Sequence, residues 1–470
     1  MSITTPTLRK LAVVAAIAGF GSAIAFGVVA SAAAGSSPAT TLVSATRSGA
    51  AGDRDSFADA ISANGRIVLF SSQARNLVSG DTNGRYDVFV RQAGITRRVS
   101  VTTGGAQAKA TRDPSGGSVA GGLSANGQYV VYRSDAPNLV PHDTNRAEDI
   151  FLYDRGSGVT ARVSISSRGR QANGPSGDPA ISADGRYVAF MSNASNLTPG
   201  DTNGLADVFV RDLHNGKTRR VSVTSHGGQA RCNLGYCEST EPVLSANGRF
   251  VAFQSSATNL VPRDTNRLGD VFVHDLRTGR TERVSVTSSG RQGGHDRTNN
   301  GSNAPAISAN GRFVAFHSAD SDLVKGDTNR VFDIFMHDRK TGRTVRVSVG
   351  SGGQANAESL GAVGISADGR YVAFASLASN LTPGDSNAIT DAFVRDLRTS
   401  KITLASLDAD GRQGLDSSAG VAFGAGDRLL VLSSYSSLAP ADKNIVSDVY
   451  LRDLSAGRWY SSTRVESSKP

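Results

Sequence analysis

Short runs of apolar residues recur along the chain, and each run is bounded by turn residues. In one such stretch, Pro179-Ala180-Ile181 leads to an Asp-Gly pair, and the apolar run 187–190 follows. An Asp-Gly or Asn-Gly pair between two apolar runs is a strong hairpin signal. A run that is apolar at every position predicts a strand covered on both faces. The β-branched and aromatic stretches 207–212 and 218–223 complete the unit, which the pattern therefore predicts to contain four strands.

The four-strand unit recurs along the chain at regular intervals. Each copy is marked by Ser-Ala-Asn/Asp-Gly followed in most copies by Arg, an aromatic residue and Val-Ala-Phe. The copies begin at Ser62, Ser124, Ser182, Ser245, Ser308, Ser366 and, in a degenerate form, Gly424. One four-stranded sheet cannot bury both of its faces, whereas a ring of such sheets packed against one another can. The sequence thus predicts an all-β fold, a seven-bladed β-propeller of four-stranded antiparallel blades.

The two ends of the repeated region predict how the ring closes. The Val-Ser pair that marks the fourth strand appears first at Val43-Ser44, before any complete unit, and the last unit lacks it. We therefore expect the N-terminal strand 41–46 to complete the last blade, because closure removes exposed sheet edges. The expected organisation is a signal peptide at 1–32, a short linker at 33–40, the propeller at 41–463 and a tail at 464–470.

The signal peptide is predicted from the pattern of the first residues. Arg9 and Lys10 precede an apolar run from Leu11 to Val29, and small residues in an Ala-x-Ala arrangement follow at 30–32. This order is typical of a cleaved export signal, although the run is also long enough to be an uncleaved anchor. We expect a secreted, extracellular or cell-envelope protein that meets the membrane only during export.

Composition agrees with the all-β prediction and narrows the function. The chain contains 52 Gly in 470 residues and only six Glu, whereas long helices favour Glu and Lys on their surfaces. With 39% hydrophobic and 19% charged residues, it is neither disordered nor a polytopic membrane protein. The net charge is +9, but it comes from arginines at regular intervals, and no stretch of five or six Lys/Arg occurs. This distribution indicates a solvated basic surface and argues against sequence-specific nucleic-acid binding.

The repeat resembles a known family. The pattern S-A-D-G-R-Y-V-A-F, then D-V-F-V-R-D-L, then R-V-S is similar to the TolB-type, WD-repeat-like propeller repeat of secreted and periplasmic bacterial proteins. The resemblance covers about residues 41–455 and implies the propeller fold. It implies little about function, since propellers serve both as binding platforms and as enzymes. TolB has six blades and an additional N-terminal domain, so the partners of TolB are not expected here.

A D-x-N-x-x-x-D motif occurs in every unit and is the candidate metal site. Its residues are Asp81, Asn83, Asp87, Asp143, Asn145, Asp149, Asp201, Asn203, Asp207, Asp264, Asn266, Asp270, Asp327, Asn329, Asp333, Asp385, Asn387, Asp391, Asp442, Asn444 and Asp448. Closely spaced oxygen ligands are how calcium-binding loops begin, so calcium is a candidate cofactor, although no cofactor is required. The favoured interpretation is structural, because Asp and Asn side chains hold turns by bonding nearby backbone N–H groups.

Other repeated residues also have structural interpretations. The arginines before Val-Ser are expected on the outer edge, where charge deters edge pairing; a basic rim that contacts a polyanion is the alternative. These residues are Arg98, Arg162, Arg220, Arg283 and Arg346. A repeated Gln is expected to bond to backbone groups, and it stands at Gln107, Gln171, Gln229, Gln292, Gln354 and Gln413. His274 and His337 replace an arginine of other units and are expected on strand surfaces.

Catalytic candidates must break the symmetry of the ring. The unrepeated polar residues of the loops are His226, Glu238, Glu241, His295, Asp296 and Arg297. The same loops contain the two cysteines, Cys232 and Cys237, which are expected to form a disulfide in an oxidising compartment. None of the common catalytic motifs is present. The sequence therefore favours a monomeric, non-catalytic platform whose loop-rich face binds a protein or a cell-envelope glycan or polyanion. The alternative is a lyase or hydrolase that acts on an extracellular polysaccharide.

Overall fold

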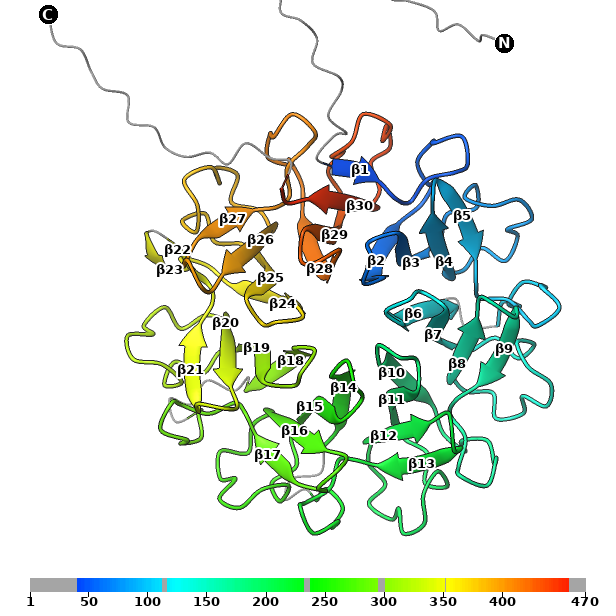
Figure 1. The fold of residues 1–470 in the computed structure, drawn as a ribbon, viewed down its shortest axis with the longest axis horizontal. Helices are drawn as coiled ribbons and strands as arrows, with labels where there is room; N and C mark the ends of the chain where they lie inside the picture. The colour runs from blue at the N-terminus through cyan, green and yellow to red at the C-terminus, as the bar shows by residue number, and fades with distance from the viewer. Residues whose placement is uncertain (1–39, 112–115, 232–236, 295–300, 351, 456–470) are drawn as a thin grey trace, which may run out of the picture. The chain divides into compact units, whose positions relative to one another are not determined.

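The structure is a computed structural model that describes residues 40–111, 116–231, 237–294, 301–350 and 352–455. The predicted signal peptide, nearly all of the linker and the tail lie outside these residues. The described residues form seven four-stranded antiparallel sheets arranged in a ring, which confirms the predicted seven-bladed β-propeller (Figure 1). They contain no helix that is long and apolar enough to cross a membrane.

In each blade the strands follow one another from the centre of the ring to its rim. Blades one to three comprise β2 (Ser56–Ile61), β3 (Ile67–Ser72), β4 (Asp87–Gln92), β5 (Ile95–Arg98), β6 (Ser118–Leu123), β7 (Tyr129–Ser134), β8 (Asp149–Asp154), β9 (Val159–Arg162), β10 (Ser176–Ile181), β11 (Tyr187–Ser192), β12 (Asp207–Asp212) and β13 (Lys217–Arg220). Blades four and five comprise β14 (Ser239–Leu244), β15 (Phe250–Ser255), β16 (Asp270–Asp275), β17 (Thr281–Arg283), β18 (Ser302–Ile307), β19 (Phe313–Ser318), β20 (Asp333–Asp338) and β21 (Arg343–Arg346). A short hairpin, β22 (Val349–Gly350) and β23 (Gly353–Gln354), precedes blade six.

The last two blades complete the ring as the sequence predicts. Blade six comprises β24 (Ser359–Ile365), β25 (Tyr371–Ser376), β26 (Asp391–Asp396) and β27 (Ile402–Leu404). Blade seven comprises β28 (Ser418–Gly424), β29 (Leu429–Ser434), β30 (Asp448–Asp453) and, as its outer strand, β1 (Thr40–Leu42). The register pairs Thr40 with Arg452 and Leu42 with Tyr450, so both ends of the repeated region share one sheet. The predicted closure by the N-terminal strand is confirmed.

The core lies between adjacent blades and within each sheet. In blade three, the Val-Ala-Phe of the second strand and the Asp-Val-Phe-Val of the third strand are buried, and the rings of Phe190 and Phe209 stack 5.9 Å apart. Blades one, two and four to six repeat this aromatic pair. A pair of large apolar side chains at the same register in successive blades gives each sheet the same thickness, so the blades pack around a ring.

The connections divide the propeller into two different faces. Turns between the first and second strands and between the third and fourth strands form the turn face, where repeated ion pairs such as Arg186–Asp212, 2.7 Å, recur in several blades. Gly185 in one of these turns has φ +76°, and a Cβ atom there would lie 2.3 Å from the Tyr129 ring of the preceding blade. The loops between the second and third strands and between blades form the opposite face, called the loop face.

Adjacent blades are also linked by polar side chains on their third strands. Arg91 Nη1 donates to the carbonyl of Ala45 at 2.6 Å, in the segment that leads from the preceding outer strand. His274 occupies the equivalent position in blade four and is 6% exposed, and its Nδ1 lies 2.9 Å from Thr281 Oγ1. The expectation that His274 and His337 lie on strand surfaces is therefore wrong, because the linker of the preceding blade covers them.

Candidate functional site: the loop face

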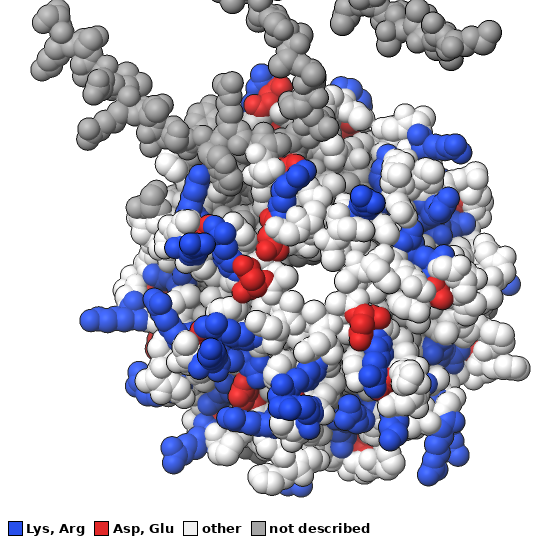
Figure 2. Space-filling view, viewed as in Figure 1, with Lys and Arg blue, Asp and Glu red and all other residues white. Residues whose placement is uncertain are grey.

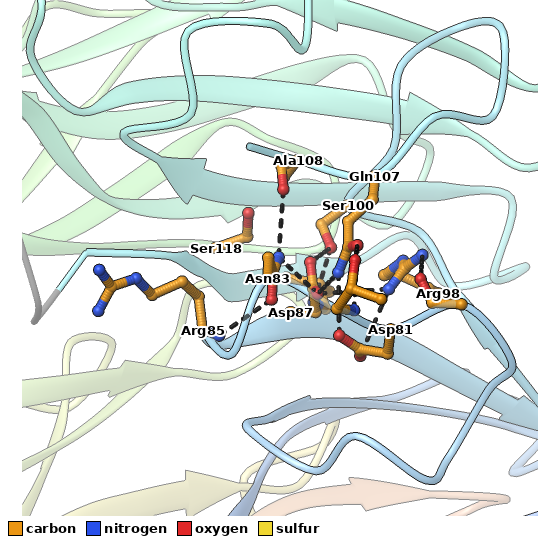
Figure 3. Close-up of polar contacts among 12 residues, drawn as sticks. Asp81, Asn83, Arg85, Asp87, Arg98, Ser100, Gln107, Ala108 and Ser118 are labelled. Carbon is orange, nitrogen blue, oxygen red and sulfur yellow. Dashed lines mark hydrogen bonds and ion pairs between the residues drawn. The ribbon is translucent and has the colours of Figure 1, made fainter. Parts of the chain in front are cut away.

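The repeated D-x-N-x-x-x-D residues form a hydrogen-bonded cluster at the loop face of each blade. In blade one, Asp87 Oδ1 accepts a bond of 2.5 Å from Ser100 Oγ, and Asp87 Oδ2 accepts one of 3.0 Å from Asn83 Nδ2 (Figure 3). The Gln107 amide then joins the two carboxylates, because Nε2 lies 2.9 Å from Asp81 Oδ1 and 3.1 Å from Asp87 Oδ2. We call this set of side chains the carboxylate cluster. It ties the loop, the third strand and the segment that leaves the fourth strand together.

An arginine completes the carboxylate cluster in five blades and corrects the sequence interpretation. Arg98 Nη1 lies 3.3 Å from Asp81 Oδ2 and 3.5 Å from Asp87 Oδ2, with a side chain that is only 10% exposed. The equivalent residues make the same two contacts at 2.8–3.5 Å: Arg162, Arg220, Arg283 and Arg346. Both expectations for these arginines, a charged edge and a basic rim, are wrong, because the guanidinium is drawn inward by two buried carboxylates.

Burial controls the ionisation of these carboxylates. It raises the pKa of Asp87 to about 6 and that of Asp270 to about 6, against the opposing effects of the adjacent arginine and of the hydrogen-bond donors. A buried carboxylate needs a cation or several donors to remain charged, and in these blades the protein supplies both. The repeated Gln contributes as well, since it bonds to side chains in addition to the backbone N–H of Thr82, 3.3 Å away.

Calcium binding at the seven motifs stays a prediction, and the geometry reduces the number of blades in which it is expected. In five blades a guanidinium already contacts the two carboxylates that would be ligands of a calcium ion. Over the described ranges no three or more His, Cys, Asp or Glu side chains are grouped as metal ligands. Only blades six and seven, where Leu404 and Leu42 replace the arginine, have carboxylate clusters without an internal cation.

The catalytic candidates are not brought together where the structure describes them. His295, Asp296, Arg297 and Cys232 lie outside the described residues, so the disulfide stays a prediction, although Cys237 is buried. His226 is exposed in the turn beyond the outer strand β13, and Glu241 lies on the innermost strand β14 of the next blade. Strands within a sheet are about 4.8 Å apart, so a side chain at the rim and one at the centre are separated by most of a blade. Glu238 is exposed just before β14.

Residues that differ from blade to blade gather instead around the central channel on the loop face. Each blade contributes the second residue of its first strand, the fifth residue of its second strand and the residue before its third strand. Hydrogen bonds such as Ser118 N to Tyr86 O, 2.8 Å, place the last of these beside the first strand of the next blade. The fifth residues of the second strands are Ser71, Arg133, Met191, Gln254, His317, Ala375 and Ser433. We call this ring of three positions per blade the channel mouth.

The sequence alone did not predict the channel mouth, because within a single blade its residues occupy ordinary strand positions. Aligning the seven copies reveals it: the fourth residue of the second strand is Phe or Tyr in six blades, whereas the fifth is of six different types. A position with the same packing role in every blade needs the same residue, so variation marks positions that packing does not determine. Figure 2 shows the disc from one side of the ring, with a hollow at its centre and with Lys and Arg side chains spread over much of the face in view.

An aromatic group forms one side of the channel mouth, between blades seven and one. The rings of Phe57 and Tyr86, two channel-mouth positions of blade one, lie 6.1 Å apart. Tyr435, which follows β29 in blade seven, borders the channel mouth near Tyr86 and is 41% exposed. Burial raises the pKa of both tyrosines, and the charge of Asp55 raises both further, so the carboxylate lies near the two hydroxyl groups. Partly exposed tyrosines beside a carboxylate offer flat apolar area together with hydrogen-bonding groups.

The opposite side of the channel mouth contains a histidine in blade five. The His317 ring stacks on Phe332 with centroids 4.1 Å apart, and its Nδ1 lies 2.7 Å from Asn303 Oδ1. Burial lowers the pKa of His317 to about 4, so the imidazole is neutral at pH 7. His317 is only 8% exposed, so packing holds its ring in place. A neutral imidazole held in one orientation by Asn303 and Phe332 fixes the shape of this side of the channel mouth.

Acidic residues line the first strands below the channel mouth. Each first strand has an irregular register near its middle, and Asp178 and Glu241 stand at the irregular position in blades three and four, with φ of +48° and +52°. Glu241 Oε2 accepts a hydrogen bond of 2.8 Å from Ala304 N in blade five, and Asp178 Oδ2 accepts one of 3.4 Å from Glu241 N. These carboxylates bind the unpaired N–H groups of neighbouring bulges, so their role is structural at least in part.

The comparisons with known proteins support the fold. No protein-family model and no curated protein matches the chain. Among solved structures, TolB from Acinetobacter baumannii is 14% identical, with a TM-score of 0.39, and the match covers 73% of this chain but only 64% of TolB. An oligogalacturonate lyase from Vibrio parahaemolyticus is 10% identical over 85% of this chain and 91% of its own, with a TM-score of 0.47. A prolyl endopeptidase matches with a TM-score of 0.52 and 12% identity, and the match covers 86% of this chain and 49% of the endopeptidase chain. This last match agrees with the propeller fold that the TolB-type repeat implies.

Proposed function

We propose that the protein is an exported, non-catalytic binding platform that recognises its ligand at the channel mouth of the loop face. One observation supports this most directly: the seven blades share the residues of their packed strands and carboxylate clusters, whereas at the channel mouth each blade contributes its own side chains. A rigid scaffold with unlike residues at one place is the usual arrangement of a binding site. The expected export signal directs this surface to a protein or a glycan of the cell envelope.

The side chains of the channel mouth suit recognition better than catalysis. Tyr86 and Tyr435 provide aromatic area, Arg133 is held by Glu148 at 2.8 Å, and His317 is neutral. Acid–base catalysis needs two groups with matched ionisation that converge on one bond. His317 bonds to the side-chain amide of Asn303 and stacks on Phe332, and neither of these neighbours carries a charge. We expect the protein to act as a monomer and to bind no nucleic acid by sequence.

The proposal is tested by binding of the full exported chain to purified cell-wall glycan and to a set of cell-envelope proteins. Replacing both Tyr86 and Tyr435 by Ala should weaken binding at least about tenfold, since buried aromatic contacts dominate binding energy. The matched control replaces Lys217 and Arg398 by Ala, two exposed residues of the turn face. Equal affinity of the two double variants would contradict the proposed site.

The same preparations distinguish the binding platform from the polysaccharide enzyme. Incubation with soluble wall polysaccharide should release neither reducing ends nor unsaturated products. Turnover that is lost in the variant His317→Gln would show that the channel mouth is an active site instead. Turnover that this variant retains would place the chemistry elsewhere and would also contradict the non-catalytic proposal.

A further inference from the structure

Blade six departs from blades one to five at one position of the carboxylate cluster. Leu404 pairs with Phe393 across β27 and β26, in the register that Arg346 and Phe335 have in blade five. The rest of the cluster is retained: Gln413 Nε2 lies 2.9 Å from Asp385 Oδ1 and 2.8 Å from Asp391 Oδ2. Two carboxylates therefore remain together while the guanidinium that accompanies them in five blades is missing.

The substitution leaves one carboxylate oxygen without a partner. Asp385 is 8% exposed, and its Oδ2 is buried with no hydrogen-bond partner among the described residues. In blade one the corresponding aspartate is contacted by the guanidinium, since Asp81 Oδ2 lies 3.3 Å from Arg98 Nη1. Asp391 is fully buried, so neither carboxylate is stabilised by bulk water. An uncompensated buried charge of this kind is strongly unfavourable.

Blade seven also lacks the arginine, but it solves the problem differently. Leu42 and Ala51 stand at the positions of the arginine and the glutamine. Tyr450 replaces the phenylalanine of the third strand, and its hydroxyl group donates a hydrogen bond to Asp442 Oδ2. The other oxygen, Asp442 Oδ1, accepts a bond from Asn444 N at 3.1 Å. Both oxygens of this aspartate are therefore satisfied, and blade six differs from it in having an unpartnered one.

We propose that blade six binds one metal cation, calcium, at the position that the arginine guanidinium occupies in blades one to five. Its protein ligands are Asp385 Oδ2, the Asp391 carboxylate and the carbonyl of Gly384. The last assignment follows from the other blades, where the guanidinium also approaches the equivalent carbonyls of Gly80, Gly200 and Gly326 at 3.4–3.5 Å. A leucine side chain ends at Cδ, whereas an arginine side chain continues to its guanidinium. In blade six the ion occupies the volume that the guanidinium fills in blades one to five.

Calcium fits this donor set better than other common cations do. All three donors are hard oxygen atoms from carboxylates and a carbonyl, and waters can complete the coordination of a large, geometrically tolerant ion. Magnesium demands a compact octahedron, and zinc prefers nitrogen and sulfur ligands. A divalent ion also neutralises both carboxylates of the pair. The site lies apart from the channel mouth, so the proposal is independent of the proposed function.

The first experiment measures calcium in the full exported chain. After dialysis against EDTA and then against buffer with 1 mM CaCl2, elemental analysis should find one calcium per chain. The Tm should fall by about 4 °C in EDTA and recover with calcium but not with magnesium or potassium. Absence of bound calcium together with an unchanged Tm would overturn the proposal. Full recovery of Tm with potassium alone would overturn the choice of calcium.

The second experiment exchanges the distinguishing residue between blades. The variant Leu404→Arg should bind no calcium and should have the same Tm with and without EDTA, because the guanidinium replaces the ion. The reciprocal variant Arg346→Leu in blade five should bind two calcium ions per chain and become more sensitive to EDTA. If Leu404→Arg fails to fold, Arg346→Leu still decides the question by its stoichiometry. A stoichiometry of one in both the wild-type protein and Arg346→Leu would contradict the exchange.

Discussion

The carboxylate clusters and the channel mouth lie on the same face of the propeller, yet they vary around the ring in opposite ways. Every motif keeps both aspartates and the asparagine, and the third-strand aspartates are fully buried in all blades. At the channel mouth, by contrast, Arg133, His317 and Ala375 occupy equivalent positions. The difference teaches that a buried pair of carboxylates permits few residues, whereas positions beside the central channel that hold no such pair permit many. Structural demand and recognition can therefore be separated by comparing the blades of one chain.

A second difference exists within the clusters themselves. Five blades supply a guanidinium, blade seven supplies the Tyr450 hydroxyl, and blade six supplies neither. Clusters that perform the same structural task are thus completed by different chemistry. The requirement that persists is the neutralisation of the buried carboxylates, and the residue that meets it can change.

Removing the closing strand should have the largest effect, because it damages the structural frame and leaves the channel mouth in place. Deletion of residues 40–46 removes Val43, which is 4% exposed, and Ser44, whose hydroxyl group bonds to Asp448 Oδ1. The exposed edge of β30 should lower the Tm by more than about 10 °C and promote aggregation. Thermal melts and size-exclusion chromatography measure both effects, with deletion of 464–470 as the control. A deletion protein as stable as the parent would contradict the closure.

Replacing one aspartate of a carboxylate cluster should have the next largest effect. Asp270→Ala removes the acceptor of Ser285 Oγ and leaves Arg283, whose side chain is 8% exposed, with one carboxylate fewer. Breaking a buried pair in this way costs about 3–5 kcal/mol of unfolding free energy. Urea unfolding measures the loss. The control Asp410→Ala, in an exposed turn, should change the free energy by less than about 0.5 kcal/mol.

The sequence predicted the propeller because its repeat carries the packing requirements of a blade. The paired phenylalanines, the Asp-Gly turns and the early Val43-Ser44 pair were enough to predict seven blades and their closure. All of these features repeat, and a repeated feature is visible without knowledge of the tertiary structure. The predicted strands 41–46 and 218–223 end later than the observed strands Thr40–Leu42 and Lys217–Arg220. The residues after each observed strand leave the sheet and contribute to the carboxylate cluster.

The sites were harder to predict because they depend on contacts between separate segments. Arg98 was assigned to the outer edge, since an arginine near the end of an edge strand normally faces solvent. Its partner Asp81 is near in sequence, but only the fold turns both inward. The channel mouth joins residues from all seven blades, and His317 differs from its neighbours in the strand by nothing visible in the sequence. Comparing copies position by position would have found it.

A pH titration extends the comparison to Asp59, an aspartate of blade one that has no arginine partner. Burial raises the pKa of Asp59 to about 7, while hydrogen bonds from Ser71 lower it. The folded protein therefore retains this proton up to about pH 7, whereas the unfolded chain loses it near pH 4. The stabilisation is complete below pH 4 and is lost as the pH rises to about 7. Relative to Asp59→Asn, the wild-type protein should lose about 4 kcal/mol of stability between pH 4 and pH 8. Parallel curves would show that Asp59 titrates normally.

The smallest effect on stability should come from the channel mouth, and it completes the comparison. Arg133 and Glu148 form an ion pair of 2.8 Å with side chains that are 38% and 34% exposed. Water screens such a pair, so Arg133→Ala should change the unfolding free energy by no more than about 1 kcal/mol. Binding of the cell-envelope ligand should weaken clearly in the same variant, because the guanidinium is one of the groups that only blade two offers. Urea unfolding and a binding isotherm are measured on one preparation. If stability falls by as much as in Asp270→Ala, the variable residues of the mouth are structural after all, and the separation between the two regions fails.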